Sequence, residues 1–525
     1  YRRWHREAVL RAKRAGFDII YVYLGHEYLL AQFRSSANQR SDEYGGSLEN
    51  RLRLSRELLQ DTKEAVGDTC AVAVRYSAAG SAADGEPVFE EHRTMLELLA
   101  ELPDLWDVVV DDYSLELGTS RFVKEGALED YMSWVKQVTT KPVVTVGRFT
   151  SPETMLRQVQ QGVVDFVGAA RPSIADPFLP AKIREGRFED IRECIGCNFC
   201  YPYAVQASPI RCTQNATMGE EWRQGWHPEH IAPKASERKL LVVGGGPAGL
   251  EAAVWLGRRG YAVTLAEARN ELGGRVTRES ATLPGLSEWA RVRDWRLAQL
   301  KQLPDVQVLL GSSVDAAQIL EFEADRVALA TGATWRKDGR GRLHEKPIPG
   351  WQDAHVLTPD DVMDGVMPQG PVLVYDEEHY YMGGVVAEKL RSAGLEVLLA
   401  TPSGRVSSWT LFFEEQSRIQ ARLIELGVRI EIDRAIQSLA AGRAELACVH
   451  TGRTREVEAA SVVMVTSREP NDALYDELCE RIDITRVGDC SAPGAIATAV
   501  FAGHRYAREM DAGETRILRE RAVSP

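Results

Sequence analysis

The sequence predicts an α/β fold made of the C-terminal part of a (β/α)8 barrel, a cysteine-rich segment and two Rossmann-like nucleotide-binding domains. Strand and helix patterns alternate up to Arg192, and four cysteines follow between Cys194 and Cys212. A strand that begins at Lys239 then runs into a glycine-rich turn and a helix. The expected domains are 1–192 for the partial barrel, 193–235 for the cysteine segment, 236–365 with 470–525 for the first nucleotide-binding domain, and 366–469 for a second, degenerate one.

The composition is that of an ordinary globular protein, because 44% of the 525 residues are hydrophobic and 26% are charged. A net charge of −13 at pH 7 argues against nucleic acid or an anionic membrane as partner, since both are negatively charged. No apolar run is long enough to span a bilayer. Of the eight cysteines, those outside the cysteine segment are scattered, which is typical of a reducing compartment. We therefore expect a cytoplasmic protein.

Five apolar strands are predicted in the barrel part, whereas a complete barrel of this kind has eight. They are 18–23, 71–76, 106–110, 142–146 and 165–168, and amphipathic helices such as 48–66 and 90–100 separate them. The sequence opens at Tyr1 inside a helical pattern and without an initiator methionine. We expect that these are the last five units and that three preceding units are absent from this sequence.

Polar side chains follow the first two predicted strands, at the end where such barrels carry their chemistry. Tyr23 and His26 stand three residues apart and could act together as hydrogen-bonding or acid–base groups. An exposed tyrosine and a solvated histidine explain the pair equally well. Arg75 ends the second strand, where a cation needs an anionic partner.

The loops after the last two strands carry glycine and arginine, in Gly147-Arg148 and Gly168-Ala169-Ala-Arg171. Such closing loops commonly bind a phosphate through backbone N–H groups and a nearby cation, and glycine lets the backbone approach closely. The pattern indicates a phosphorylated ligand. Flavin mononucleotide (FMN) and a sugar phosphate both fit.

Four cysteines form the most specific pattern in the chain. Cys194, Cys197 and Cys200 make a C-x2-C-x2-C run, and Cys212 follows after an eleven-residue gap. Four thiolates in one short segment are the ligand set of an iron–sulfur cluster. A zinc site is the first alternative, although zinc cysteines usually come as two separated C-x2-C pairs, and disulfides are the second. We interpret the segment as an iron–sulfur site that relays electrons between the two halves.

The first nucleotide site is predicted by a glycine-rich turn that contains Gly244, Gly246 and Gly249. These glycines permit a tight turn, close approach of a pyrophosphate and close helix–strand packing. Glu267 ends the next strand about 20 residues on, where an acidic side chain can accept from a ribose hydroxyl. An adenine nucleotide is therefore expected here.

The corresponding turn of the second nucleotide-binding unit has lost its glycine pattern. It reads Asp376-Glu-Glu-His-Tyr380-Tyr-Met-Gly-Gly384, with acids and aromatic rings where the pyrophosphate of NAD(P)H would lie. Anionic side chains repel a phosphate and bulky ones block it. We expect no NADPH binding at this position.

Several motifs resemble a known family. Residues 32–51, which read QFRSSANQRSDEYGGSLENR, are similar to the signature of old-yellow-enzyme-type FMN barrels, as are Val146-Gly-Arg148 and the segment GAARPSIADP at 168–177. With the cysteine run and the nucleotide-binding half, the chain resembles the trimethylamine/dimethylamine dehydrogenase-like subfamily. The 2,4-dienoyl-CoA reductases are relatives of that subfamily. The resemblance covers essentially all of the chain.

The resemblance implies a role for each candidate residue. It assigns FMN contacts to Arg75, Gly147, Arg148, Gly168, Ala169 and Arg171, with Arg171 at the phosphate; a 4Fe–4S cluster to the four cysteines; and ADP or FAD to the first nucleotide site. Tyr23 and His26 match an active-site tyrosine and histidine, and Glu116, with Asp112 as second choice, matches an acidic substrate residue. Tyr201 and Tyr203 replace a tryptophan region, which indicates a substrate bulkier than trimethylamine.

The expected protein is an iron–sulfur flavoprotein that oxidises a secondary or tertiary amine through FMN. Electrons would leave through the 4Fe–4S cluster to an electron-transfer flavoprotein, and the expected assembly is a homodimer. The alternative is an NAD(P)H-dependent enoate or 2,4-dienoyl-CoA reductase, which the lost second turn disfavours. A third hypothesis is a non-catalytic protein that binds ADP and a cluster.

Overall fold

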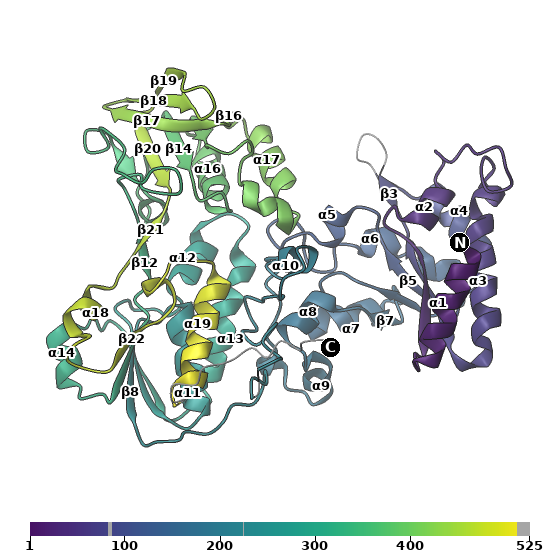
Figure 1. Ribbon diagram of the computed structural model, residues 1–525, viewed down its shortest axis with the longest axis horizontal. Coiled ribbons are helices and arrows are strands. Elements are labelled where there is room, and N and C mark those ends of the chain that lie inside the picture. Colours follow the sequence, from purple (N-terminus) through teal and green to yellow (C-terminus); the bar gives the residue numbers. More distant parts are fainter. Residues whose placement is uncertain (82–86, 224, 512–525) are drawn as a thin grey trace, which may run out of the picture. The chain divides into compact units, whose positions relative to one another are not determined.

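The computed structural model describes residues 1–81, 87–223 and 225–511 (Figure 1). The chain divides into two compact units, Tyr1–Ser173 and Ile174–Pro525. Each unit is built on parallel sheets connected through helices, so the predicted α/β class is confirmed. Within the described ranges, none of the helices combines the length and the apolar character that crossing a membrane requires.

One five-stranded parallel sheet, in the order β1-β2-β5-β6-β7, forms the centre of the first unit. Its strands are β1 (Ile19–Leu24), β2 (Ala71–Ser77), β5 (Leu105–Val109), β6 (Val143–Thr145) and β7 (Phe166–Val167), and a small antiparallel pair consists of β3 (Gly80–Ser81) and β4 (Pro87–Val88). Each strand of the large sheet overlaps one of the five predicted strands. Because the strands are parallel, their carboxyl ends meet at one edge of the sheet. The existence of three further units stays a prediction.

The helices of the first unit cover this sheet in the manner of βα units. They are α1 (Arg2–Arg14), α2 (Leu29–Arg34), α3 (Leu48–Val66), α4 (Glu90–Leu99), α5 (Tyr113–Glu116), α6 (Glu129–Met132), α7 (Pro152–Gln160) and α8 (Ala170–Ala175). Helix α3 shows why they form. Its first turn is capped by the Ser47 side chain, its apolar face buries Leu58 and Leu59, and it ends at Gly67, whose φ of 55° stops the helix.

The second unit contains two five-stranded parallel sheets, as two Rossmann-like units require. The first has the order β10-β9-β8-β11-β22 and the second β13-β20-β14-β15-β16; the pair β12-β21 and the sheet β17-β18-β19 are antiparallel. The strands are β8 (Lys239–Val243), β9 (Ala262–Ala266), β10 (Val306–Leu309), β11 (Arg326–Leu329), β12 (Ala333–Trp335), β13 (Val356–Leu357), β14 (Val372–Asp376), β15 (Val397–Ala400), β16 (Arg429–Glu431), β17 (Arg434–Ala440), β18 (Arg443–Cys448), β19 (Thr454–Glu458), β20 (Ser461–Val465), β21 (Arg468–Pro470) and β22 (Ile484–Arg486).

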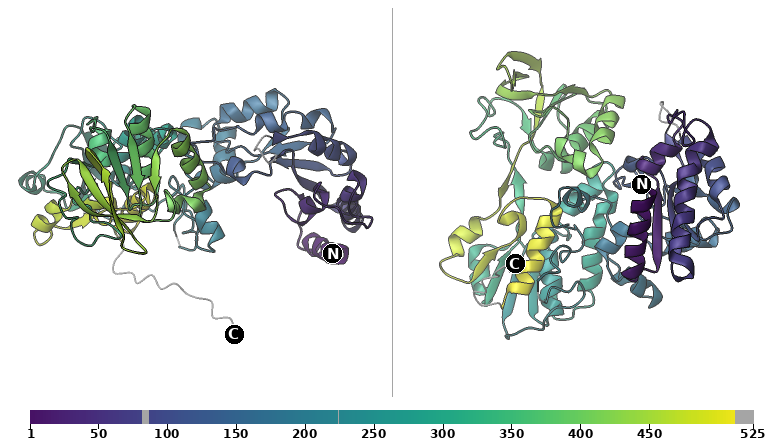
Figure 2. Two further views of the ribbon diagram at one scale, coloured as in Figure 1. Left: turned by 90° about the horizontal axis from the view of Figure 1, so that it is seen from above. Right: turned by 45° about the vertical axis from the view of Figure 1, so that its right-hand side comes forward.

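The helices of the second unit include one buried apolar helix at each nucleotide-type turn. They are α9 (Leu179–Arg184), α10 (Tyr201–Val205), α11 (Pro247–Arg258), α12 (Arg275–Thr282), α13 (Arg291–Leu300), α14 (Ala316–Glu321), α15 (Pro359–Met363), α16 (Met382–Ser392), α17 (Gln416–Glu425), α18 (Ala473–Leu478) and α19 (Ile496–Glu509). Helix α11 follows β8 and packs against α19, the yellow helix of Figure 2. Leu250, Val254 and Val500 are fully buried there, so this pair forms the core beside the first glycine-rich turn.

Candidate functional site

A continuous chain of hydrogen bonds joins the three residues expected to be catalytic. The Tyr23 hydroxyl lies 2.5 Å from His26 Nδ1, and His26 Nε2 lies 2.6 Å from Glu116 Oε2. The histidine side chain is 1% exposed and that of Glu116 is 8% exposed, whereas Tyr23 is 36% exposed. Since an ionised carboxylate can only accept, Nε2 donates to Glu116 and Nδ1 accepts from Tyr23. The chain of bonds thus runs from an accessible phenol to a buried carboxylate.

Arg75 fixes the far end of this chain. Its guanidinium donates to Glu116 Oε1 over 2.9 Å and to Asp107 Oδ2 over 2.8 Å. The register of β2 and β5 places Arg75 directly beside Asp107, so the two side chains leave the same face of the sheet. One guanidinium between two carboxylates leaves a net negative charge, which favours a cationic ligand.

Backbone contacts hold His26 in an uncommon conformation. Its φ is 54°, and its N–H is directed to Asp111 Oδ1 at 3.0 Å and Ser77 Oγ at 3.2 Å. Arg34 in turn donates to Asp111 Oδ2, and the Tyr113 ring stacks on the imidazole at 4.3 Å. A histidine in the left-handed region persists only where its surroundings impose it. These partners therefore aim the imidazole at Glu116.

Tyr23 and Asp107 are among the ionisable groups of the site that have shifted pKa values. Burial raises the pKa of Tyr23 above its usual range, although the charge of Arg75 opposes the shift. Burial likewise raises the pKa of the Asp107 carboxyl against the effect of Arg75. The Tyr23 phenol consequently remains protonated at neutral pH and can donate to His26.

Sequence reasoning found only part of this site. Asp107, Asp111 and Tyr113 were missed, because nothing in their spacing shows that they face Arg75 and His26. The second choice for the acidic residue, Asp112, has a different position: its side chain accepts from the N–H groups of Ser114 and Leu115 at the start of α5. Asp112 is therefore a helix cap, which is the ordinary role of an aspartate there.

The residues expected at the phosphate lie together, but their side chains make contacts within the protein. Gly147, Arg148, Arg171 and Glu116 line one small cavity. Arg171 donates to the carbonyl oxygens of Glu116, Leu117 and Gly118 over 2.9–3.1 Å, which closes the end of α5. Its expected contact with a phosphate stays a prediction.

Arg148 and two further expected FMN residues, Gly168 and Ala169, also make contacts within the protein. The Arg148 guanidinium donates to the Val123 carbonyl over 3.0 Å. A Cβ atom on Gly168 would lie 3.0 Å from the Thr145 carbonyl oxygen, and the carbonyl of Ala169 accepts from Ser173 at the start of α8. For FMN, the observation that fits is at Arg75: its buried Nε has no partner among the described residues, and an acceptor atom of a flavin would satisfy it.

The four cysteines lie on one segment of the second unit, and each is partly exposed. The N–H of Gly196 is directed at Cys194 Sγ and that of Gln214 at Cys212 Sγ, each over 3.4 Å. Burial raises the pKa of Cys197 to about 11 and that of Cys212 to about 12. Within the ranges described, no three His, Cys, Asp or Glu side chains are arranged to hold a metal ion. The donor set and the N–H···S contacts nevertheless fit an iron–sulfur group, whose binding would require deprotonation of the thiols.

A buried network ties this segment to the first nucleotide-binding domain. The Gln214 amide donates to the carbonyls of Glu193 and Arg291 and accepts from Arg296 over 3.1 Å. Arg296 also pairs with Glu251 of α11 at 2.7 Å, and neither side chain is more than 2% exposed. The cysteine loop is thereby anchored through two buried charges.

The first nucleotide site is a cleft of about 510 Å³ beside the glycine-rich turn. A Cβ atom on Gly246 would meet nothing within 4 Å, so this position leaves open space at the start of α11. Gly249, by contrast, lies so close to the turn that a Cβ would sit 1.9 Å from the Gly244 oxygen. Glu267 accepts from the Gly245 N–H over 2.6 Å at the same edge. An open cradle at a helix N-terminus fits a pyrophosphate.

Acidic side chains occupy the second turn. Burial, together with the charge of Glu378, raises the pKa of Asp376 to about 7. A Cβ atom on Gly383 would lie 2.6 Å from the Asp376 side chain, so that carboxyl fills the space in front of α16. Glu377 accepts from Tyr375 and contacts His344. Of the tyrosines noted near the cysteines, the Tyr203 side chain lies outside the described structure.

Comparisons with known proteins agree with this organisation. Residues 2–190 match the NADH:flavin oxidoreductase / NADH oxidase family, and residues 213–318 and 238–364 match pyridine nucleotide-disulphide oxidoreductases. Dimethylamine dehydrogenase from Hyphomicrobium sp. (strain x) is 39% identical over 546 residues, covering 96% of this chain and 74% of that protein.

Two solved structures are similar over nearly the whole chain. Histamine dehydrogenase from Rhizobium sp. 4-9 is 48% identical with a TM-score of 0.95, over 98% of this chain and 76% of that one. The 6-hydroxypseudooxynicotine amine oxidase from Pseudomonas geniculata N1 is 48% identical with a TM-score of 0.93, over 97% and 78%. The chain is therefore an oxidoreductase that belongs to the trimethylamine/dimethylamine dehydrogenase-like subfamily of old-yellow-enzyme-type FMN oxidoreductases.

Proposed function

We propose that this protein is an amine dehydrogenase that oxidises a secondary or tertiary amine in its first unit. The observation that carries the proposal is the hydrogen-bonded chain from Tyr23 through His26 to Glu116. The similar proteins are a dimethylamine dehydrogenase, a histamine dehydrogenase and a 6-hydroxypseudooxynicotine amine oxidase. These names support an amine as the substrate of this protein.

The residues of the site can bind an ammonium ion and make it neutral. The net negative charge of Arg75, Asp107 and Glu116 attracts the cation. The Tyr23 oxygen can accept the ammonium proton as its own proton passes to His26 Nδ1, and the Glu116 carboxylate stabilises the imidazolium that forms. Only the neutral amine has the nitrogen lone pair that assists cleavage of the adjacent C–H bond.

The cofactors proposed are FMN, a 4Fe–4S cluster and ADP, with FAD as the alternative to ADP. FMN would be held near Arg75 and the loops that carry Gly147, Arg148 and Arg171, and the cluster by the four cysteines. When bound, FMN supplies a two-electron acceptor and the cluster a one-electron outlet toward an electron-transfer flavoprotein. Acidic side chains occupy the turn at Asp376, which disfavours binding of NADPH there. This supports transfer of electrons to a protein acceptor and disfavours the alternative of an NADPH-dependent enoate reductase.

Anaerobic titration of the purified holoprotein with dimethylamine, histamine and sarcosine tests this function. We expect amine-dependent loss of flavin absorbance, about four irons per chain, and loss of iron in Cys197→Ala. Turnover driven by NADPH with an enoate acceptor, and none with any amine, would establish the alternative. Recovery of zinc alone after anaerobic purification would remove the electron relay from the proposal.

A further inference from the structure

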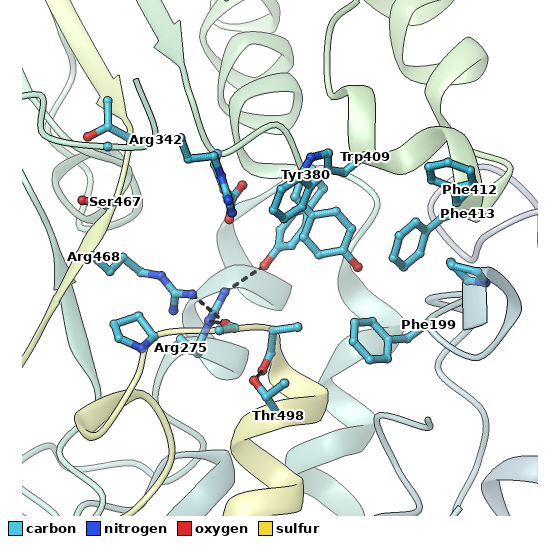
Figure 3. A pocket seen from close by; sticks show the side chains of 18 of the residues that line it. Phe199, Arg275, Arg342, Tyr380, Trp409, Phe412, Phe413, Ser467, Arg468 and Thr498 are labelled. Atoms are coloured by element: carbon cyan, nitrogen blue, oxygen red, sulfur yellow. Dashed lines mark hydrogen bonds between the residues drawn. The ribbon is translucent and has the colours of Figure 1, made fainter. Parts of the chain in front are cut away.

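A further cavity, of about 700 Å³, lies in the second unit and is not used by the proposed reaction (Figure 3). Aromatic side chains make up much of its wall: Phe199, Tyr380, Tyr381, Trp409, Phe412 and Phe413. Their rings lie close to one another, with centroids 4.8 Å apart for Tyr380 and Tyr381 and 5.1 Å apart for Tyr380 and Phe413. The volume is in the range of small-molecule sites, and such walls suit a planar ring.

Charged side chains of both signs line the cavity: Glu378 contributes a carboxyl whose pKa is raised by burial, and three arginines form one wall. Figure 3 shows Arg275, Arg342 and Arg468 on one side and the phenylalanine rings on the other. Arg275 pairs with Glu279 and Asp489, and Arg468 pairs with Asp489, so two carboxylates largely neutralise these two arginines. Arg342 is exposed, stacks over Trp409 at 3.8 Å, and forms no hydrogen bond or ion pair with the residues that the structure describes. Its guanidinium is available to an anion.

Two uncompensated polar features lie at this cavity. Thr466 is one of its lining residues and is 4% exposed, and the buried Thr466 hydroxyl has no partner in the described structure. The first turn of α19, a helix of 14 residues, begins at the cavity beside Gly494 and Ala495 and has no side-chain cap. A buried hydroxyl without a partner costs stability, and an uncapped helix N-terminus attracts negative charge. Both features point to a ligand with acceptor oxygens.

We infer that this cavity binds a planar aromatic carboxylate. The ring would lie among Tyr380, Phe413 and Phe199, and the carboxylate would pair with Arg342 while accepting from Thr466 or the first N–H groups of α19. The cavity adjoins the nucleotide cleft, because Arg275, Trp335 and Arg468 border both.

The test is a calorimetric titration of the holoprotein with 2-naphthoate in the presence of saturating ADP. We expect saturable binding with a stoichiometry of one per chain, and binding at least about tenfold weaker for 2-naphthamide and for cyclohexanecarboxylate, because each lacks one recognised feature. No saturable binding, or binding abolished by ADP or by the amine substrate, would overturn the inference. The inference would also be overturned if denaturation released FAD instead of ADP and the same protein did not bind 2-naphthoate.

Two variants locate the ligand. Arg342→Ala should weaken 2-naphthoate binding about tenfold, whereas Arg340→Ala, at an exposed arginine of the same segment outside the cavity, should not. Thr466→Val keeps the shape and removes the unpartnered hydroxyl, so it should weaken binding without lowering the melting temperature. Equal affinity in Arg342→Ala and the Arg340→Ala control would place the ligand elsewhere and contradict the inference.

Discussion

His26 illustrates how a single side chain depends on its neighbours for its chemistry. Its ring has an acceptor position toward Tyr23 because the opposite nitrogen donates to Glu116. Its backbone conformation is imposed by contacts with Asp111 and Ser77. A histidine with the same sequence neighbours but without these partners would be an ordinary solvated imidazole.

Glu116→Gln should raise KM for the amine about tenfold and lower kcat less. The neutral amide leaves Arg75 with Asp107 as its single charged partner, so the site loses the negative charge that attracts an ammonium ion. Steady-state kinetics with dimethylamine and sarcosine measure the effect. Glu64→Gln, at an exposed position of α3, is the matched control. An unchanged KM in Glu116→Gln would contradict this account of binding.

Tyr23→Phe should slow flavin reduction by about 10²-fold or more while leaving the melting temperature unchanged. The substitution removes the only hydroxyl that the geometry places on His26 Nδ1 within the described site, and positioned acid–base groups contribute rate factors of this order. Stopped-flow spectroscopy under anaerobic conditions gives the rate. Tyr28→Phe changes a nearby exposed tyrosine that does not contact the imidazole nitrogens, and it should reduce flavin at the normal rate.

At the level of elements, the glycine-rich turn before α11 contains one glycine that packing requires and another that is open to a ligand. Gly249 touches the backbone of the turn, whereas Gly246 faces the open cleft. Both positions belong to one motif in the sequence, but only the structure shows which glycine serves the fold and which serves the ligand.

Gly249→Ala should destabilise the protein and Gly246→Ala should not. A methyl group 1.9 Å from the Gly244 oxygen forces the helix away from the turn, at a cost of about 1–3 kcal/mol or more. At Gly246 the methyl group enters the cleft, so bound ADP should be lost, while the melting temperature of the nucleotide-free protein should stay unchanged. Calorimetry and chromatography of released nucleotide measure the two effects. Equal nucleotide content in Gly246→Ala and the parent protein would show that the phosphate does not approach this position.

The elements were more predictable than the contacts between them. Long apolar runs identified all five strands of the first unit, because a strand buried between helices reads as a continuous hydrophobic segment. The expectation of subfamily membership was confirmed as well. Asp107 could not be recognised as a site residue, because it lies inside such an apolar run. Only the pairing of its strand with the neighbouring strand places it beside Arg75. The contacts of Arg171 with the end of α5 were equally invisible in the sequence.

For the whole molecule, a buried histidine of the nucleotide-binding half makes a contribution to stability that depends on pH. His504 is buried against Glu251, and burial lowers its pKa from 6.5 to about 4. Because its folded-state pKa is depressed, protonation favours the unfolded state, and the stability it contributes is present above pH 6.5 and lost as the pH falls toward 4.

The expected loss is on the order of 3 kcal/mol, at about 1.4 kcal/mol per pKa unit. It should appear as a difference in melting temperature between the parent protein and His504→Gln that grows as the pH falls from 6.5 to 4. The difference isolates His504, because Asp376, whose pKa is raised to about 7, gains stability over the same pH range. His450→Gln, at an exposed histidine, should follow the parent profile. Parallel profiles for the parent protein and His504→Gln would refute the assignment.

The anchoring of the cysteine loop through Gln214 and the buried pair Arg296–Glu251 has a consequence for folding cooperativity. Opening the loop would leave two buried charges without a full set of partners, so the loop cannot melt separately at low cost. Local unfolding at the cysteines and global unfolding of the helices around α11 should therefore occur together. Hydrogen exchange would then report one protection energy for both regions, and the cysteine segment would behave as part of a larger domain.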